Sequence, residues 1–163
     1  MSTATAETTI NSQESGLSRS DASNGLIKSS CAWAAASTLI PLSGADIAAL
    51  AAVQANLVIN ISSLYGEKVE KYAVSGVIAT LLGTLLPAYA ATYALTAAAK
   101  VIPIPGVGSL LSFPALAGSN AAATYAVGKV FVNHYENGGT FASFNPTASK
   151  DSLMSEFAAK KAS

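Results

Sequence analysis

The sequence predicts an all-α fold: a hydrophobic helical bundle of four to six helices with a central helical hairpin. Hydrophobic residues make up 51% of the 163 residues and charged residues only 11%, against roughly 25% charged in ordinary soluble domains. Only six of the charged residues lie within 29–128. A soluble helix needs a polar face opposite its apolar stripe. Helices with so few charges must therefore cover one another, pack into an oligomer or face lipid.

The chain divides into three parts. Residues 1–25 are rich in Ser, Thr and Ala and have almost no large apolar side chains, so we expect a disordered polar tail. Residues 26–139 carry the apolar runs and form the predicted hydrophobic helical domain. Residues 140–163 are expected to hold a loop and a short amphipathic C-terminal helix, with Leu153 and Phe157 on its apolar side.

Two helices are expected before the hairpin, over 26–40 and 45–65. Pro41 and Gly44 break the chain between them, since proline cannot continue the first helix. Asp46 lies in the first turn of the second helix, where the helix dipole favours a carboxylate.

Gly66 is expected to end the second helix, since glycine accepts the left-handed conformation of a C-terminal cap. A third helix would open with Glu67 and Lys71, an i,i+4 pair worth roughly a few tenths of a kcal/mol. If this helix is unbroken over 72–102, it is about 46 Å long. That exceeds a hydrocarbon core of about 30 Å, so we expect a kink or break at Pro87, a strong tilt or a water-exposed end.

The central hairpin is predicted from two uncharged runs of equal length, 72–99 and 101–128. A single lysine and a turn containing Pro105, Gly106 and Gly108 separate the two runs. Because glycine and proline both disfavour a continuous helix, the chain is expected to reverse there.

An internal repeat is also predicted. The segment 40–44 aligns with 102–106 through an initial Ile-Pro and a final Gly, and the same shift aligns Gly66 with Gly128. Each half then consists of a helix, an Ile-Pro turn and a helix, which would make the bundle pseudo-two-fold symmetric.

Small residues recur every four positions along the last long helix, expected over 112–135. They form two rows: Ala115, Ser119 and Ala123, and Gly118, Ala122 and Ala126. This spacing lets a second backbone approach closely. It fits either Ala-rich packing within a tight bundle or a helix–helix interface in a membrane.

Three amide side chains interrupt the apolar second helix. Asn56 and Asn60 are four residues apart and share a face, whereas Gln54 points elsewhere. Buried amides must find hydrogen-bond partners. These residues are therefore expected either to join helices and set their register, or to line a water-filled lumen.

No catalytic, cofactor or metal site is predicted, and we expect no enzyme activity. His134 is the one histidine, and the sequence offers no Cys, Asp or Glu cluster of the kind that metal sites need. The lone Cys31 on an apolar stretch is typical of a buried small residue. Residues 123–130 imitate a phosphate-binding loop, but Ala123 replaces its first glycine and Val130 its Ser or Thr. Without clustered Lys and Arg, no nucleic-acid partner is expected.

Several of these residues together resemble a known family. They are the Ile-Pro-x-x-Gly-Ala-Asp-Ile run over 40–47, Gln54, the Leu-Tyr-Gly run containing Tyr65, the Ile-Pro-Gly-x-Gly run over 104–108, and the Ala-x-Tyr-Ala-x-Gly run through Tyr125 to Gly128. The combination, over about 32–139, resembles the bacterial domain-of-unknown-function family six-nine-seven. The resemblance implies a hydrophobic, membrane-associated helical module without enzyme activity of its own. Members of that family often lie beside or fused to small GTPases. Because this sequence shows no GTPase domain, such a partner is expected to be a separate protein.

We expect this protein to act by binding, as a membrane-embedded or membrane-associated scaffold or adaptor in the inner (cytoplasmic) membrane, with its tails in the cytoplasm. Residues 74–102 and 110–135 would be its deepest parts. The expected partners are the lipid bilayer, further copies of the chain in a homo-oligomer, and a separate GTPase. The alternative is a soluble, oligomeric bundle in the cytoplasm that conceals its apolar hairpin and inserts into membranes to form a pore.

Overall fold

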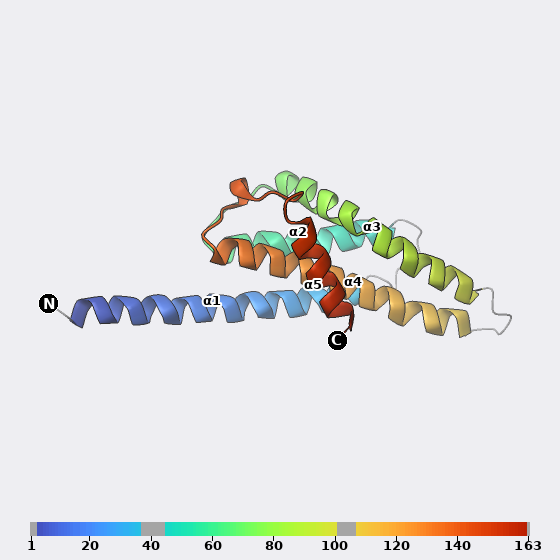
Figure 1. Cartoon of the computed structure of the whole chain (residues 1–163), viewed down its shortest axis with the longest axis horizontal. Helices are drawn as coiled ribbons and strands as arrows, with labels where there is room; N and C mark the ends of the chain where they lie inside the picture. Colours follow the sequence, from blue (N-terminus) through green and yellow to red (C-terminus); the bar gives the residue numbers. More distant parts are fainter. Residues whose placement is uncertain (1–2, 37–44, 101–106, 163) are drawn as a thin grey trace.

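The structure is all-α, as the sequence predicts (Figure 1). The computed structural model describes residues 3–36, 45–100 and 107–162. Within these ranges it contains five α-helices, one 3₁₀ turn and no strand, which confirms the predicted fold class. The elements are α1 (Thr3–Ala36), α2 (Ala45–Leu64), α3 (Lys71–Lys100), α4 (Val107–Glu136), the 3₁₀ turn η2 (Phe141–Ser143) and α5 (Lys150–Ala162).

Helix α4 is the centre of the bundle. It packs against each of the other four α-helices, and Figure 1 shows α5 crossing it. From Ser119 onward most of its residues are buried, and Phe131 is its largest fully buried side chain. Contact on several sides explains why this helix is apolar nearly all round instead of along one stripe.

Helix α3 packs against α4 and α2 through one stripe of side chains. The buried residues are three or four positions apart, as one face of a helix requires: Val74, Ile78, Leu81, Leu85, Tyr89 and Thr92. The opposite face is exposed. Pro87 lies on that exposed face. Helix α3 continues through it and is therefore not broken there.

The polar N-terminal segment forms the first part of a helix in the structure. Helix α1 is continuous from Thr3 through Gly25 to Ala36, and its N-terminal half extends beyond the other helices (Figure 1). Its C-terminal half packs against α4, with Ser23 and Ile27 buried. The expected disordered tail over 1–25 rests on composition, which describes the polar segment in isolation. Extending a helix that already exists fixes one residue per hydrogen bond, which costs far less than nucleating a new one.

Two glycines end helices in the left-handed conformation, Gly66 at φ 86° and Gly138 at φ 77°. After α2, the Glu67 N–H donates to the Ser62 carbonyl at 2.9 Å, and the Gly66 N–H donates to the Ser63 carbonyl at 3.1 Å. This pair of hydrogen bonds is a Schellman motif, which satisfies carbonyls at the helix end. The predicted cap at Gly66 is therefore confirmed, and α4 ends in the same way.

Two helix starts differ from the prediction. Helix α3 begins at Lys71 and not at Glu67, whose carboxylate accepts a hydrogen bond from the Phe141 backbone N–H at 2.6 Å. A hydrogen bond to a residue 74 positions further along the chain thus replaces the expected pair of Glu67 with Lys71. Helix α4 begins at Val107, so Pro114 lies inside it instead of in its first turn. Pro114 is exposed, and because proline has no N–H it donates no hydrogen bond within the helix.

The two Ile-Pro turns of the predicted repeat lie outside the described residues. Those turns contain four of the residues that carry the family resemblance: Pro41, Gly44, Pro105 and Gly106. The pseudo-two-fold symmetry therefore stays a prediction. Asp46 and Gly108 lie in the first turns of α2 and α4.

Gly128 marks a close approach between α4 and α1. A Cβ atom at this position would lie 2.5 Å from Ile27 Cγ1 and 3.3 Å from Leu57 Cδ2. The substitution Gly128→Val is therefore expected to destabilise the bundle by about 1–3 kcal/mol, as overpacking of a core does. Thermal unfolding of Gly128→Val, Ile27→Ala and the double variant measures this. The double variant should lose less than the sum of the single losses, because alanine leaves room for the valine. Strictly additive losses would contradict the close approach.

Candidate functional site

The outer face of α3 is the most unusual surface of the bundle. In the described ranges, Lys71–Thr92 is the one segment long and apolar enough to cross a membrane, with 22 residues and a mean hydropathy of 1.6. Core helices of soluble proteins share such length and composition, but they are mostly buried. Only 28% of this segment is buried inside the bundle. A long uncharged face is therefore left open.

This open face consists of small and apolar side chains. Exposed residues recur every four positions along it: Ser75, Ala79, Gly83, Pro87 and Ala91. Tyr72 and Leu86 are its large apolar side chains, 92% and 62% exposed. At Gly76 and Gly83, an added Cβ would meet nothing within 4 Å. The face is thus neutral and unobstructed.

Residues 110–135, the second segment expected to lie deep in the membrane, have a different environment. From Ser119 to Tyr135, most residues of α4 are buried among the other helices. Protein therefore surrounds this part of α4 within the chain itself, and its apolar sequence is explained by that packing.

The two rows of small residues on α4 also face into the bundle over much of their length. Ser119, Ala122 and Ala123 are buried, whereas Ala115 and Gly118 are exposed. A turn further on, Tyr125 is half-buried, with the Lys160 ammonium 5.6 Å from the centre of its ring. The buried members of the rows pack within the chain, and the two exposed members line a cleft described below.

The three amides of α2 separate into two groups. Gln54 is fully buried, and its Nε2 donates to Thr124 Oγ1 of α4 at 3.5 Å. In the described part of the chain, Gln54 Oε1 has no hydrogen-bond partner. Asn56 and Asn60 are exposed. Gln54 therefore joins α2 to α4, whereas the two asparagines lie on the outside of the bundle.

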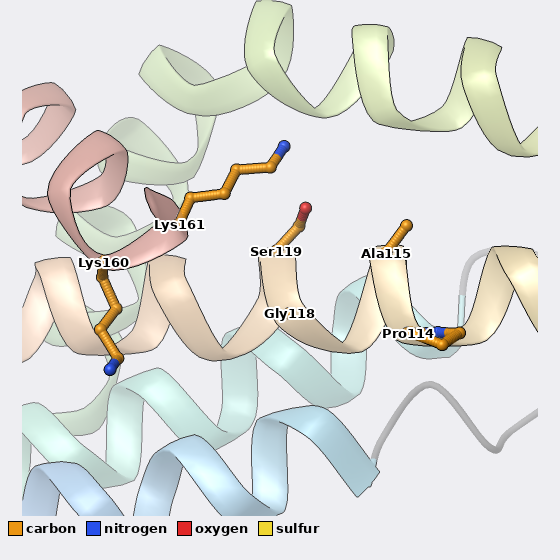
Figure 2. A pocket seen from close by; sticks show the side chains of 6 residues that line it. All are labelled: Pro114, Ala115, Gly118, Ser119, Lys160 and Lys161. Atoms are coloured by element: carbon orange, nitrogen blue, oxygen red, sulfur yellow. The ribbon is translucent and has the colours of Figure 1, made fainter. Parts of the chain in front are cut away.

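A polar group that was not predicted from the sequence joins α3, α4 and α5. Lys161 Nζ donates to Thr92 Oγ1 at 3.1 Å, and Thr92 Oγ1 lies 3.4 Å from Ser119 Oγ. The Tyr89 hydroxyl donates to the Ser119 carbonyl at 3.3 Å. Beside this group lies a cleft of about 240 Å³, lined by Pro114, Ala115, Gly118, Ser119, Lys160 and Lys161 (Figure 2). No local signal pairs Lys161 with Thr92, because 69 residues separate them.

A second polar group lies where α2 and α4 end. The rings of Tyr65 and Tyr135 stack with their centroids 5.2 Å apart. The Tyr135 hydroxyl lies 2.7 Å from Ser62 Oγ, and the Tyr65 hydroxyl donates to Glu136 Oε1 at 3.3 Å. Arg19, the two tyrosines and Glu136 line a cleft of about 190 Å³. Of this group, only Tyr65 was singled out in the sequence.

Aromatic side chains gather around Phe131. Phe144 stacks on it with centroids 4.2 Å apart, and Phe141 stacks at 6.3 Å. His134 lies edge-on to Phe144 at 5.2 Å, and its Nε2 is 2.9 Å from the Thr140 carbonyl oxygen. The histidine thus packs and hydrogen-bonds within the fold. No three His, Cys, Asp or Glu side chains gather as metal ligands among the described residues.

Burial raises the pKa of three weak acids above their ordinary values: the Cys31 thiol and the Tyr65 and Tyr135 hydroxyls. Desolvation is the largest cause for each, because a low-dielectric environment disfavours the charged form. At Cys31 the nearby Lys160 ammonium opposes this rise. The folded state therefore holds these protons more tightly than the unfolded chain does.

The bundle is accordingly expected to lose stability at alkaline pH. The ordinary pKa values are 9.0 for the thiol and 10.0 for the tyrosines. Stability from a raised pKa is complete below the unfolded value and is lost as the pH rises through the folded value. Thermal unfolding measured from about pH 7 to pH 11 should therefore show a fall beginning near pH 9. Cys31→Ala and Tyr135→Phe should each flatten that fall. A constant melting temperature over this range would contradict the raised pKa values.

These features define the class of protein: an all-α bundle with a largely buried central helix and one apolar helix of membrane-crossing length open on its outer face. The chain belongs to the family described as Domain of unknown function (DUF697), whose sequence profile matches residues 4–159. The resemblance predicted from the motifs is thereby confirmed. The match extends well beyond 32–139 and includes most of α1 and α5.

One relative of known name is Magnetosome membrane protein 22 of Magnetospirillum gryphiswaldense. It is 34% identical over 158 residues, which cover 95% of this chain and 78% of the relative. No solved structure matches the chain.

Proposed function

We propose that this protein is a membrane-associated helical scaffold or adaptor without catalytic activity, and that α3 is the helix that contacts lipid. One observation carries the proposal: Lys71–Thr92 is apolar, yet its uncharged outer face is open. Apolar surface exposed to water costs free energy, because its removal from water is favourable by roughly 25 cal/mol per Å². Contact with a bilayer removes that cost.

The length of the segment supports contact across the whole hydrocarbon layer. Its 22 described residues extend about 33 Å at 1.5 Å per residue, enough to cross a hydrocarbon core of about 30 Å. Lys71 begins helix α3, and Lys100 ends it. An ammonium group therefore marks each end, as is usual where lysines reach the water interface.

The hydroxyl groups on the open face are compatible with lipid. Ser75 Oγ donates to the Lys71 carbonyl at 2.8 Å, and Thr80 Oγ1 donates to the Gly76 carbonyl at 3.0 Å. In hydrocarbon every polar group must find its partner inside the protein. These two side chains meet that requirement within their own helix.

The comparisons support the same location, because a relative of 34% identity is named as a membrane protein. We place this chain in the inner (cytoplasmic) membrane. Helices α3 and α4 are consecutive and lie side by side (Figure 1). A chain that enters along α3 returns along α4, so the N-terminal tail is proposed to lie in the cytoplasm, whereas Lys161 near the C-terminus lies beside Thr92, about 30 Å along α3 from Lys71.

We also propose two protein partners. A second copy of the chain is one, since small residues spaced by four on α3 let another backbone approach closely. A separate GTPase is the other, as the family resemblance implies. The polar group around Tyr65 and Glu136 offers hydrogen-bonding groups for such a partner.

Fractionation of cells that express the full chain tests the proposal. The protein should stay in the membrane pellet through a high-salt wash and be released by detergent. An alkaline wash is the poorer choice, because the raised pKa values predict a loss of stability there. Release by salt alone would contradict contact between α3 and lipid. Recovery as a soluble, defined oligomer would favour the alternative, a bundle that covers α3 with further copies, and leakage of vesicles exposed to that oligomer would then indicate a pore.

A further inference from the structure

We propose that the outer face of α2 binds a second copy of the chain through the side-chain amides of Asn56 and Asn60. This inference rests on the proposed function, since it requires a bilayer around the apolar helices, and it specifies where the second copy binds. The exposed residues of this face recur every four positions along α2: Ala48, Ala52, Asn56 and Asn60. The face therefore has small side chains in its first half and two amides in its second half.

Neither asparagine has a hydrogen-bond partner within the chain. In the parts of the chain that the structure describes, no hydrogen bond joins either side chain to another residue. Each amide carries two N–H donors and an oxygen acceptor. Water satisfies these groups on a soluble protein, but in hydrocarbon every polar group needs a partner inside the protein. Two amides on one apolar helix face therefore indicate a missing polar partner.

The position of the asparagines along α2 places them within the hydrocarbon layer. Helix α2 packs against α3, and residues 65–70 connect the two helices. This end of both helices faces water, because four charged residues gather there: Glu67, Lys68, Glu70 and Lys71. No residue within 47–66 is charged. Asn56 precedes the end of α2 at Leu64 by eight residues, or about 12 Å, which is near the middle of a core of about 30 Å.

The outer face of α3 needs no such partner. Ser75 Oγ and Thr80 Oγ1 donate to carbonyls of their own helix, so lipid can cover that face. The small residues of α3 permit a second copy to approach, whereas the amides of α2 require a polar group to do so. Lipid tails supply no hydrogen bond. Lipid therefore suits the face of α3, and protein suits the face of α2.

A second copy fits this face better than another protein does. An amide is both donor and acceptor, so it can pair with its own counterpart. Copies inserted in one orientation are related by an axis along the bilayer normal, so their α2 helices are parallel. A two-fold interface of this kind brings the same residues of both copies together, and Ala48 and Ala52 let the two backbones approach closely. A soluble protein such as a GTPase does not reach this depth.

Sedimentation equilibrium of the full chain in a neutral detergent tests the proposal. We expect the parent chain to dimerise. The double variant Asn56→Leu/Asn60→Leu should raise the dissociation constant of the dimer at least about tenfold, because each hydrogen bond between membrane helices contributes about threefold to 30-fold. Both residues are exposed, so leucine does not disturb the core, and circular dichroism checks this. Asn56→Gln/Asn60→Gln keeps the amides and should recover most of the lost affinity.

The matched variant Ser75→Leu/Thr80→Leu makes the same change on α3. It also replaces two exposed polar residues of an apolar helix by leucine, but both hydroxyls bond within their own helix. The dissociation constant of the dimer should therefore change by less than about threefold. A loss equal to that of the asparagine variant would place the second copy against α3.

Oxidative cross-linking in cell membranes locates the interface directly. In a Cys31→Ala background, Ala52→Cys and Ala79→Cys each place one thiol at an exposed alanine, on α2 and on α3. A disulfide requires Cα atoms within about 7 Å. Treatment with copper phenanthroline in air should therefore convert most of the Ala52→Cys chain to a covalent dimer and leave most of the Ala79→Cys chain monomeric.

Three results would overturn the inference. They are a parent chain that stays monomeric, equal losses of affinity in the two leucine double variants, and as much covalent dimer from Ala79→Cys as from Ala52→Cys. Retention in the membrane pellet after a high-salt wash is a separate readout. If the parent chain is retained but monomeric, the membrane role of α3 stands without this interface. If the parent chain is not retained, the proposed function itself fails.

Discussion

The substitution Gly83→Arg is expected to release the protein from membranes while leaving the helical bundle folded. Gly83 lies near the middle of Lys71–Thr92, is exposed, and has open space around it. An arginine there meets no neighbour within the bundle, and it is a better helix former than glycine. At the centre of a bilayer, however, a charged side chain costs about 2.5–3.5 kcal/mol on insertion scales. Membrane retention should therefore fall by roughly a hundredfold.

The matched control is Gly25→Arg, which places the same side chain at an exposed glycine of α1 with open space around it. Both variants should give the helical circular dichroism of the parent chain. Fractionation after a high-salt wash should then find Gly25→Arg in the pellet and Gly83→Arg in the supernatant. If Gly83→Arg stays in the pellet as firmly as the control, the open face of α3 does not contact lipid.

Much of the fold could be predicted because its signals are local. The low charge over 29–128 predicted helices that cover one another, pack into an oligomer or face lipid, and Gly66 predicted the end of α2. A glycine cap depends only on the backbone conformation of one residue. Such a signal is present in the sequence whatever the helix packs against.

The failure of the prediction at Glu67 has the opposite cause. Glu67 was expected to pair with a lysine four residues away, but it accepts a hydrogen bond from the Phe141 N–H. A tertiary contact decides the local structure there, and a local sequence pattern cannot contain that contact.

In the candidate sites, too, local features could be predicted from the sequence and tertiary contacts could not. The apolar length of α3 was visible in the sequence, but which face stays open depends on the positions of α2 and α4. The cleft beside Lys161 depends on α5 folding back onto α3 and α4, and the Tyr65–Tyr135 stack joins the ends of two helices. The family resemblance covered Tyr65 and Gly128, and the structure gives both a physical role: a stacked ring at a helix end and a close approach to Ile27.

The largest loss of stability is expected from Phe131→Ala. Phe131 is fully buried in α4 and stacks against Phe144 and Phe141. These two residues belong to the segment that connects α4 to α5. Truncating a buried phenylalanine removes its burial and leaves a cavity, at a cost of about 3–5 kcal/mol. Because domains of this size are stable by only about 5–15 kcal/mol, the variant should be barely folded.

Trp33→Ala is the control for the loss of an aromatic ring, since Trp33 is 71% exposed. It should change the free energy of unfolding by less than about 0.5 kcal/mol. Urea titration in a mild detergent, followed by circular dichroism, compares the two variants. Phe131→Leu, which keeps most of the buried volume, should recover more than half of the loss. If Phe131→Ala and Trp33→Ala unfold at the same urea concentration, the aromatic cluster does not hold the α4–α5 connection, and the placement of α5 beside α3 loses its main support.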